Sequence, residues 1–143
     1  MAEDLYPGRL VAHAKAARGK GRLDSPDATH TADNPLCGDR VTADVRLAEG
    51  RIAALALHVR GCLLCEAAAS VIGAHAPGST PDDVAAVARD LAAYLKGKTA
   101  APPASWPDLA DFAPVRAHRS RHTCVTLPFE AAERAIAKAA KTG

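Results

Sequence analysis

Aromatic residues are scarce in this sequence, at 3% of its 143 residues. Rings bury more apolar surface than other side chains, so a core with few of them depends on Ala, Val, Leu and Ile. Hydrophobic residues nevertheless make up 48% of the chain, which is enough for one globular domain with its own core. We therefore expect a single domain over residues 1–143 with a thin aliphatic core, to whose stability a bound metal could contribute.

The sequence also has no marked excess of either charge, and it has no long apolar runs. Its 18 basic and 16 acidic residues are interspersed, and only the short segment 116–122 is locally basic, which argues against a nucleic-acid-binding surface. Apolar runs such as residues 52–57 are too short to cross a bilayer, and no signal sequence is visible at the N-terminus. A cytoplasmic protein is expected. In that reducing compartment the four cysteines are thiols, metal ligands or reactive groups rather than a disulfide framework.

The first half of the chain predicts a helix and a β-hairpin. Residues 5–18 have a loosely helical apolar pattern that ends at Gly19. Apolar and polar residues alternate over 41–47, which predicts a strand with one buried face. Residues 52–59 are the expected returning strand, joined to the first by a turn at 48–51.

The second half predicts three helices. The Ala-rich segment 63–76 reads as a helix that stops before Pro77. Ser79 or Thr80 can cap the next helix, with Pro81 near its first position. Residues 99–107 are a proline-rich spacer, and the last helix is expected over residues 125–141.

Residues with metal-ligand chemistry stand at the predicted ends of these elements. Cys37 and Asp39 lie two positions apart on a loop, and Gly38 between them lets both side chains turn toward one point. Cys62 follows the hairpin, and Cys124 precedes the last helix. Three sulfurs and one oxygen suffice for a four-coordinate site suited to zinc or to iron–sulfur chemistry.

The place of Cys124 at a helix N-terminus predicts a reactive thiolate. Unpaired backbone N–H groups, the helix dipole and nearby Arg121 all favour the charged form and are expected to lower its pKa. The alternative, which holds for each cysteine of the chain, is that it serves as a small buried apolar residue.

Cys65 and the histidines leave further alternatives open. Cys62 and Cys65 form a CxxC without the second pair of a zinc site or the βαβ context of a redox motif. Cys65 lies one helical turn after Cys62, so it either faces the site as a spare ligand or sulfur acceptor or packs as an apolar residue. His122 is close enough in sequence to Cys124 to reach the site. His58 is interpreted as a packing or surface residue, and no ligand spacing connects the other histidines, His13, His30, His75 and His118.

Three blocks of the sequence carry a family resemblance. They are Asn-Pro-Leu-Cys-Gly-Asp at 34–39, Gly61-Cys62 after a strand, and Arg-His-Thr-Cys-Val-Thr-Leu at 121–127 heading the last helix. In order and context they resemble the signature motifs of the NifU/IscU/SufU family of iron–sulfur cluster assembly proteins. The resemblance implies an α+β fold, in which helices pack on a small three-stranded antiparallel sheet whose remaining strand precedes Cys37.

Within that family the chain is similar to the SufU-type branch. The long stretch between Cys62 and Cys124 resembles an extra segment of that branch, and Arg121 stands three residues before Cys124 as in the SufU pattern. IscU-type proteins carry a histidine immediately before the last cysteine, where this chain has Thr123. The IscU chaperone motif Leu-Pro-Pro-Val-Lys is absent, so an Hsp70 partner is not expected.

The resemblance implies a scaffold or sulfur-transfer protein rather than a conventional enzyme. In a first hypothesis a cysteine desulfurase delivers sulfur, and iron joins it on Cys37, Cys62 and Cys124. The cluster then passes to recipient apo iron–sulfur proteins, and the harder oxygen ligand of Asp39 keeps the site labile. In a second, zinc holds the thiolates until a SufS-type desulfurase displaces one, and Cys37 then accepts the persulfide sulfur. A third hypothesis, a structural zinc module for protein interactions, predicts a closed site, whereas Asp39 favours an open one.

Overall fold

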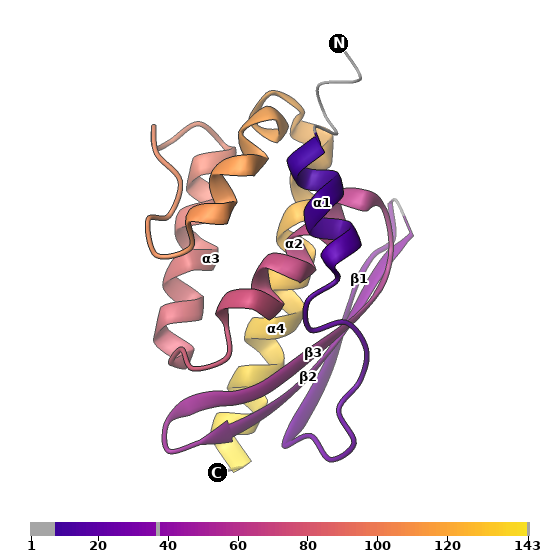
Figure 1. Cartoon of the computed structure of the whole chain (residues 1–143), viewed down its shortest axis with the longest axis vertical. Coiled ribbons are helices and arrows are strands. Elements are labelled where there is room, and N and C mark those ends of the chain that lie inside the picture. Colours follow the sequence, from indigo (N-terminus) through magenta and orange to yellow (C-terminus); the bar gives the residue numbers. More distant parts are fainter. Residues whose placement is uncertain (1–7, 37, 143) are drawn as a thin grey trace.

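Helices cover one side of a small antiparallel sheet in this protein, whose structure is a computed structural model that describes residues 8–36 and 38–142 (Figure 1). The elements in chain order are α1 (Gly8–Ala16), β1 (Ala28–Asn34), β2 (Asp39–Ala48), β3 (Arg51–Arg60), α2 (Leu63–His75), α3 (Pro81–Leu95), the 3-10 segments η2 (Pro107–Ala117) and η3 (Arg119–Arg121), and α4 (His122–Thr142). This is the α+β fold that the family resemblance implied.

The sheet is an antiparallel meander in the order β1-β2-β3. β2 and β3 form the predicted hairpin, and each is one or two residues longer than expected at either end. Glu49 and Gly50 connect them with φ of +54° and +78°, the pair of positive angles that a tight hairpin turn needs to match the twist of its strands. The pairing of Arg40 with Arg60 brings the start of β2 and the end of β3 to the same edge of the molecule.

β1 is the strand that the polar sequence Ala-Thr-His-Thr-Ala-Asp-Asn did not predict by periodicity. Its backbone pairs with β2 from Ala28 opposite Val45 to Asn34 opposite Asp39. Only Ala32 in it is fully buried, and the hydroxyls of Thr31 and Thr42 form a cross-strand hydrogen bond of 2.9 Å. The strand therefore exists because β2 offers it a partner and not because of its own apolar pattern.

α4 crosses the sheet and contacts β1, β2, α2 and α3. α2 is buried between α1, α4 and β3, which explains why it is apolar around most of its circumference. The loop after α1 crosses α2 at Gly73, where a Cβ would lie 2.1 Å from the carbonyl oxygen of Arg18. A glycine at this position is what lets the two backbones touch.

Three helical segments differ from the prediction. The first helix spans Gly8–Ala16, while residues 5–7, which were expected to belong to it, lie outside the described residues. η2 was not predicted, because Pro107 and Pro114 indicated an irregular chain, yet its apolar residues are buried and hold the segment against α3. α4 begins at His122, three residues earlier than expected.

The core is mainly aliphatic, as the composition indicated. Every aromatic residue in the described part of the chain is at most 4% exposed, namely Tyr94, Trp106, Phe112 and Phe129. Alanine supplies much of the remaining contact, especially on α2 and α4. Among the described residues, no helix has the length and apolarity needed to traverse a membrane.

One buried carboxylate ties the N-terminal loop to the sheet. Asp44 on β2 is fully buried and accepts hydrogen bonds from the guanidinium of Arg22 at 2.7 and 3.1 Å, from the backbone N–H of Leu23 at 3.0 Å, and from the hydroxyl of Thr29 at 2.6 Å. Burial by itself raises the pKa of this carboxyl, but the hydrogen bonds and the charge of Arg22 bring it below its usual value. Asp44 is therefore held ionised at neutral pH.

Candidate metal centre

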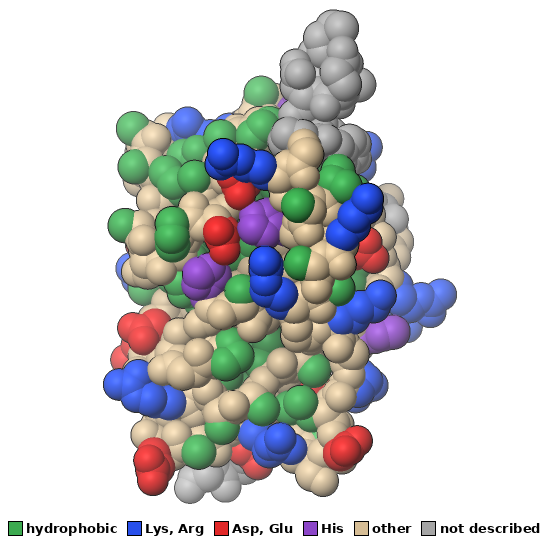
Figure 2. All heavy atoms as spheres, viewed as in Figure 1, with side chains coloured by type: hydrophobic (Ala, Val, Ile, Leu, Met, Phe, Trp, Pro, Cys, Tyr) green, Lys and Arg blue, Asp and Glu red, His purple; other side chains and the backbone are tan. Residues whose placement is uncertain are grey.

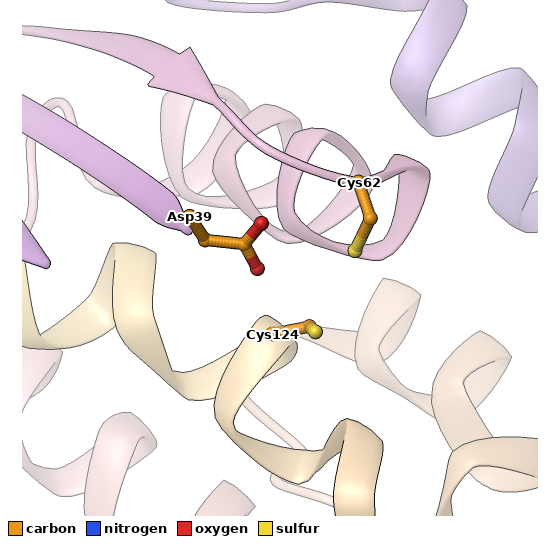
Figure 3. A group of neighbouring side chains, drawn as sticks. All are labelled: Asp39, Cys62 and Cys124. Atoms are coloured by element: carbon orange, nitrogen blue, oxygen red, sulfur yellow. The ribbon is translucent and has the colours of Figure 1, made fainter. Parts of the chain in front are cut away.

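Three side chains with metal-ligand atoms meet at one end of the sheet. Asp39, Cys62 and Cys124 each offer one ligand atom, and these atoms all lie within 4.8 Å of one another. Asp39 opens β2, Cys62 follows β3, and Cys124 belongs to the first turn of α4, so three distant parts of the chain surround a common space (Figure 3). Cys37, the fourth expected ligand, lies outside the described residues.

Strand pairing and a tight turn place Asp39. The last pair of the β1–β2 ladder is Asn34 opposite Asp39. The N–H of Gly38 donates to the carbonyl of Asn34 at 2.8 Å, and the side chain of Asn34 accepts from the N–H of Leu36 at 3.1 Å. Asp39 is 5% exposed, so its carboxylate is turned inward at the point where the turn meets the sheet.

Cys62 is placed by the junction between β3 and α2. It is the N-cap residue of α2 and has extended backbone angles, φ −75° and ψ 173°, but its side chain makes no capping hydrogen bond. The sulfur is therefore directed elsewhere, toward Asp39 and Cys124. Gly61, just before it, has no room for a side chain, because a Cβ there would lie 2.9 Å from Asp39 Oδ1.

Cys124 is buried, at 2% exposure, in the first turn of α4. Its burial, together with the neighbouring Cys62 and Asp39, raises the pKa of this thiol to about 12. The expectation of a lowered pKa is therefore wrong for the protein without a bound cation. Burial and the two neighbouring acidic groups set the direction of this shift.

This donor set suits a cation that binds sulfur and oxygen. Zinc with bonds of about 2.3 Å to sulfur and about 2.0 Å to oxygen separates tetrahedral ligand atoms by about 3.5–3.8 Å. Atoms already within 4.8 Å of one another need to move little to reach that spacing. A cation between them also removes the mutual repulsion of ionised groups and displaces the proton of the Cys124 thiol. The residues present therefore fit a zinc or iron centre.

The strand end that carries Asp39 borders a surface cavity, although Asp39 itself is 5% exposed and its carboxylate is turned inward. A cavity of about 530 Å³ borders Asp39 and is lined also by Asn34, Arg40 and Arg60. Leu36, in the same turn, is 97% exposed. The cavity and the exposed turn give a partner access to the strand end that carries Asp39.

Two residues that the sequence left open are not among the converging ligands that the described residues supply. Cys65 is fully buried in α2 and belongs to the hydrophobic core, as the packing alternative indicated. His122 Nε2 lies 3.1 Å from the carbonyl oxygen of Val115 and 3.3 Å from that of Arg116. Since carbonyl oxygens only accept, this nitrogen carries the proton and donates to η2, and His122 is not among the ligand atoms that converge.

Sequence reasoning missed the role of Gly61. The residue was quoted as part of a motif, but the reason for a glycine there is the close approach of the Asp39 carboxylate, with Cys65 Cβ also only 3.3 Å from a hypothetical Cβ. A glycine directly before a candidate ligand was the only signal, and it cannot be separated from an ordinary turn glycine by sequence alone.

Comparison with known proteins agrees with this arrangement. The two iron-sulfur cluster assembly scaffold proteins IscU 1 and IscU 2 of Archaeoglobus fulgidus are each 27% identical over 65% of this chain, a match that spans only 61% of their own length. The zinc-dependent sulfurtransferase SufU of Bacillus subtilis is 24% identical over 95% of this chain and 92% of its own.

A solved structure and a family model cover almost the whole chain. The crystal structure of the N-terminal part of a nitrogen-fixing NifU-like protein from Brucella abortus superimposes with a TM-score of 0.92 and 30% identity, over 99% of both chains. The model of the NifU-like N terminal domain matches residues 5–140. Fold, motif order and sequence thus agree, and the chain belongs to the NifU-like N-terminal domain family.

Proposed function

We propose that this chain, acting as a single assembly domain over residues 1–143, is a scaffold for iron–sulfur cluster assembly. It accepts sulfur from a cysteine desulfurase, binds iron or the nascent cluster on Cys37, Asp39, Cys62 and Cys124, and hands the cluster to apo iron–sulfur proteins. It works in the cytoplasm. The proposal is supported by the names of the relatives, which include assembly scaffolds, and by the match of this chain to the NifU-like N terminal domain.

The observation that carries the proposal is the convergence of Asp39, Cys62 and Cys124 within 4.8 Å beside an open cavity. Thiolates bind iron strongly, whereas a carboxylate oxygen is a harder ligand that exchanges more easily. Such a mixed set can hold a cluster and still release it. A centre built only to stabilise a fold is expected to be closed by four strong ligands, without an exchangeable oxygen.

The two described thiols of the cluster have different surroundings, which suggests a division of roles. Cys124 is almost fully buried and anchors the metal, while Cys62 is partly exposed at the end of β3. Cys37, two residues before Asp39, is the proposed sulfur acceptor. Its thiolate attacks the terminal sulfur of the desulfurase persulfide, a new S–S bond forms on Cys37, and the desulfurase cysteine leaves as a thiolate.

A second candidate function is that of a zinc-dependent sulfur acceptor that activates a SufS-type desulfurase. It is favoured by the SufU relative, whose alignment covers 95% of this chain at 24% identity. It is also favoured by the position of His122, whose ring donates to η2 instead of entering the cluster. In this function zinc holds the thiolates until the desulfurase displaces Cys37. Sulfur then moves by the same attack, without iron.

The deciding experiment measures metal content and visible absorption of protein purified without oxygen. Samples are compared before and after incubation with cysteine, ferrous iron, a thiol reductant and a SufS-type desulfurase. A scaffold develops an iron–sulfur chromophore that moves to an apo iron–sulfur protein. A sulfur acceptor retains stoichiometric zinc, develops no chromophore and accelerates the desulfurase.

Two variants and one matched control connect the outcome to the site. Cys124→Ser removes the anchoring thiolate and is expected to abolish metal retention, whereas Asp39→Ala removes the exchangeable oxygen and is expected to slow the release of a bound cluster. Cys65→Ala removes a buried thiol that lies outside the cluster and is expected to leave metal binding intact. Protein that binds neither zinc nor a cluster, and does not affect the desulfurase, would contradict both functions.

A further inference from the structure

A second group of metal-ligand side chains lies far from the thiols. His13 on α1 and Asp108 and Asp111 on η2 have ligand atoms within 4.8 Å of one another. His75, the last residue of α2, adds a second imidazole, whose Nε2 lies 2.9 Å from Asp108 Oδ2. Histidine and acidic side chains gather accordingly between α1 and the orange 3-10 segment on the face shown in Figure 2. The sequence suggested no ligand spacing for these histidines, because three separate elements bring the four residues together.

The four side chains are partly buried but still in contact with solvent. Side-chain exposure is 12% for His13, 14% for Asp111, 27% for His75 and 40% for Asp108. An ion can therefore enter from solvent and still lose part of its hydration shell. Cys62 and His75 stand at opposite ends of α2, separated by about 20 Å at 1.5 Å per residue, so this group is independent of the thiolate centre.

The donor types match a particular class of ion. Two imidazole nitrogens and two carboxylate oxygens suit divalent first-row transition metals such as zinc and ferrous iron, whereas calcium and magnesium prefer oxygen alone. His13 Nε2 lies 2.9 Å from Asp111 Oδ2, as a hydrogen bond requires. A metal with bonds of about 2.0–2.1 Å spreads tetrahedral ligands to about 3.4 Å, about 0.5 Å more than this pair has now. The other ligand atoms of the group lie within 4.8 Å and would draw together around the ion.

The surrounding charges are compatible with a cation. Arg9 pairs with Asp111 at 3.2 Å but is 83% exposed, so it can swing into solvent at little cost. Arg18 acts on Asp108 and is a further positive charge that an ion has to tolerate.

We propose that His13, His75, Asp108 and Asp111 form a second metal site, which takes a divalent first-row transition metal such as zinc or ferrous iron. The bound ion links α1, α2 and η2. The site does not depend on the proposed function, because its ligands are separate from the thiols. In the structure the same residues form two His–Asp hydrogen bonds.

Cobalt titration of the apo protein without oxygen distinguishes the two sites. Cobalt at the thiolate centre has intense sulfur-to-cobalt charge-transfer absorption, while cobalt held by nitrogen and oxygen shows only weak d–d bands. We expect wild type to bind cobalt of both kinds. His75→Gln and Asp111→Asn should weaken only the second kind, by about tenfold or more. His58→Gln, on an exposed position of β3, serves as the control and should change neither.

A stability measurement keeps the test valid if one centre is lost. In Cys62→Ser/Cys124→Ser, zinc should still raise the melting temperature, and adding His75→Gln should abolish that rise. The charge-transfer band reports in the first assay that each variant is folded. The proposal is overturned if wild type binds no cobalt beyond the thiolate-bound amount, or if His75→Gln and Asp111→Asn bind as wild type does.

Discussion

Replacing Gly61 with alanine should damage the metal centre without removing a ligand. A Cβ at this position lies 2.9 Å from Asp39 Oδ1, 3.0 Å from Asp39 Cγ and 3.3 Å from Cys65 Cβ. Gly61 is not among the glycines with positive φ, so alanine fits the backbone and the effect is one of space alone. The carboxylate is a side-chain terminus, and it is the group that can give way.

The expected magnitude follows from these distances. Ordinary van der Waals contact begins near 3.4 Å, so the carboxylate has to move by about 0.5 Å from its present place. Metal–ligand distances tolerate about 0.2 Å. We expect zinc affinity to fall about 10- to 100-fold, as for other changes that disturb how a ligand is oriented, which corresponds to about 1.4–2.8 kcal/mol. Overpacking should reduce the free energy of unfolding of the apo protein by about 1 kcal/mol.

Competition with a chromophoric chelator measures the zinc affinity, and urea unfolding of the apo protein measures stability. Gly8→Ala is the control, because a Cβ at Gly8 meets nothing within 4 Å. Both quantities should equal those of wild type in this control. Gly61→Ala protein that is folded and binds zinc as tightly as wild type would refute the reasoning that Gly61 fixes the position of Asp39.

Three further changes test how the fold supports the site. Asp44→Asn should lower the free energy of unfolding at neutral pH by about 2 kcal/mol, because a charged acceptor of several hydrogen bonds is lost. Because the pKa of Asp44 is lowered, its contribution to stability is complete above about pH 3.8 and is lost as the pH falls further. The free energies of unfolding of wild type and variant, measured with urea, should therefore converge below that pH. A difference that stays constant with pH would contradict this expectation. Gly73→Ala should cost about 3 kcal/mol or more, since the new Cβ meets backbone at Arg18 that cannot move away easily; an unchanged melting temperature would disprove the contact. Thr80→Ala removes one half of the capping box with Asp83 at the start of α3 and should cost about 1 kcal/mol by urea unfolding, with the metal content unchanged.

Local patterns were sufficient for the elements that carry their own signals. The alternation over residues 41–47 predicted β2 because one face of that strand is buried and the other is exposed. Thr80 and Pro81 marked the start of α3, since a capping hydroxyl and an N-terminal proline act within a single turn. β1 and η2 were not predicted from their own residues, because the strand depends on its pairing with β2 and the 3-10 segment on burial against α3.

The candidate ligands were visible in the sequence as residue types, but not as a site. Asp39, Cys62 and Cys124 stood at predicted element ends, and motif order alone suggested that they belong together. Their convergence within 4.8 Å depends on the β2–β3 pairing and on the packing of α4 across the sheet. Cys65 shows the converse, because its CxxC spacing permitted a ligand role while tertiary packing placed it in the core.

The sequence by itself determined the chemistry available to this protein: the ligand types, the hairpin, the helix caps and the aliphatic core. Those properties depend on residues close together in the chain. The tertiary structure decided the pKa of Cys124, the need for a glycine at 61, and the meeting of His13 and His75 with acidic residues of η2. Each of these depends on burial or distance between remote segments, which no local pattern encodes.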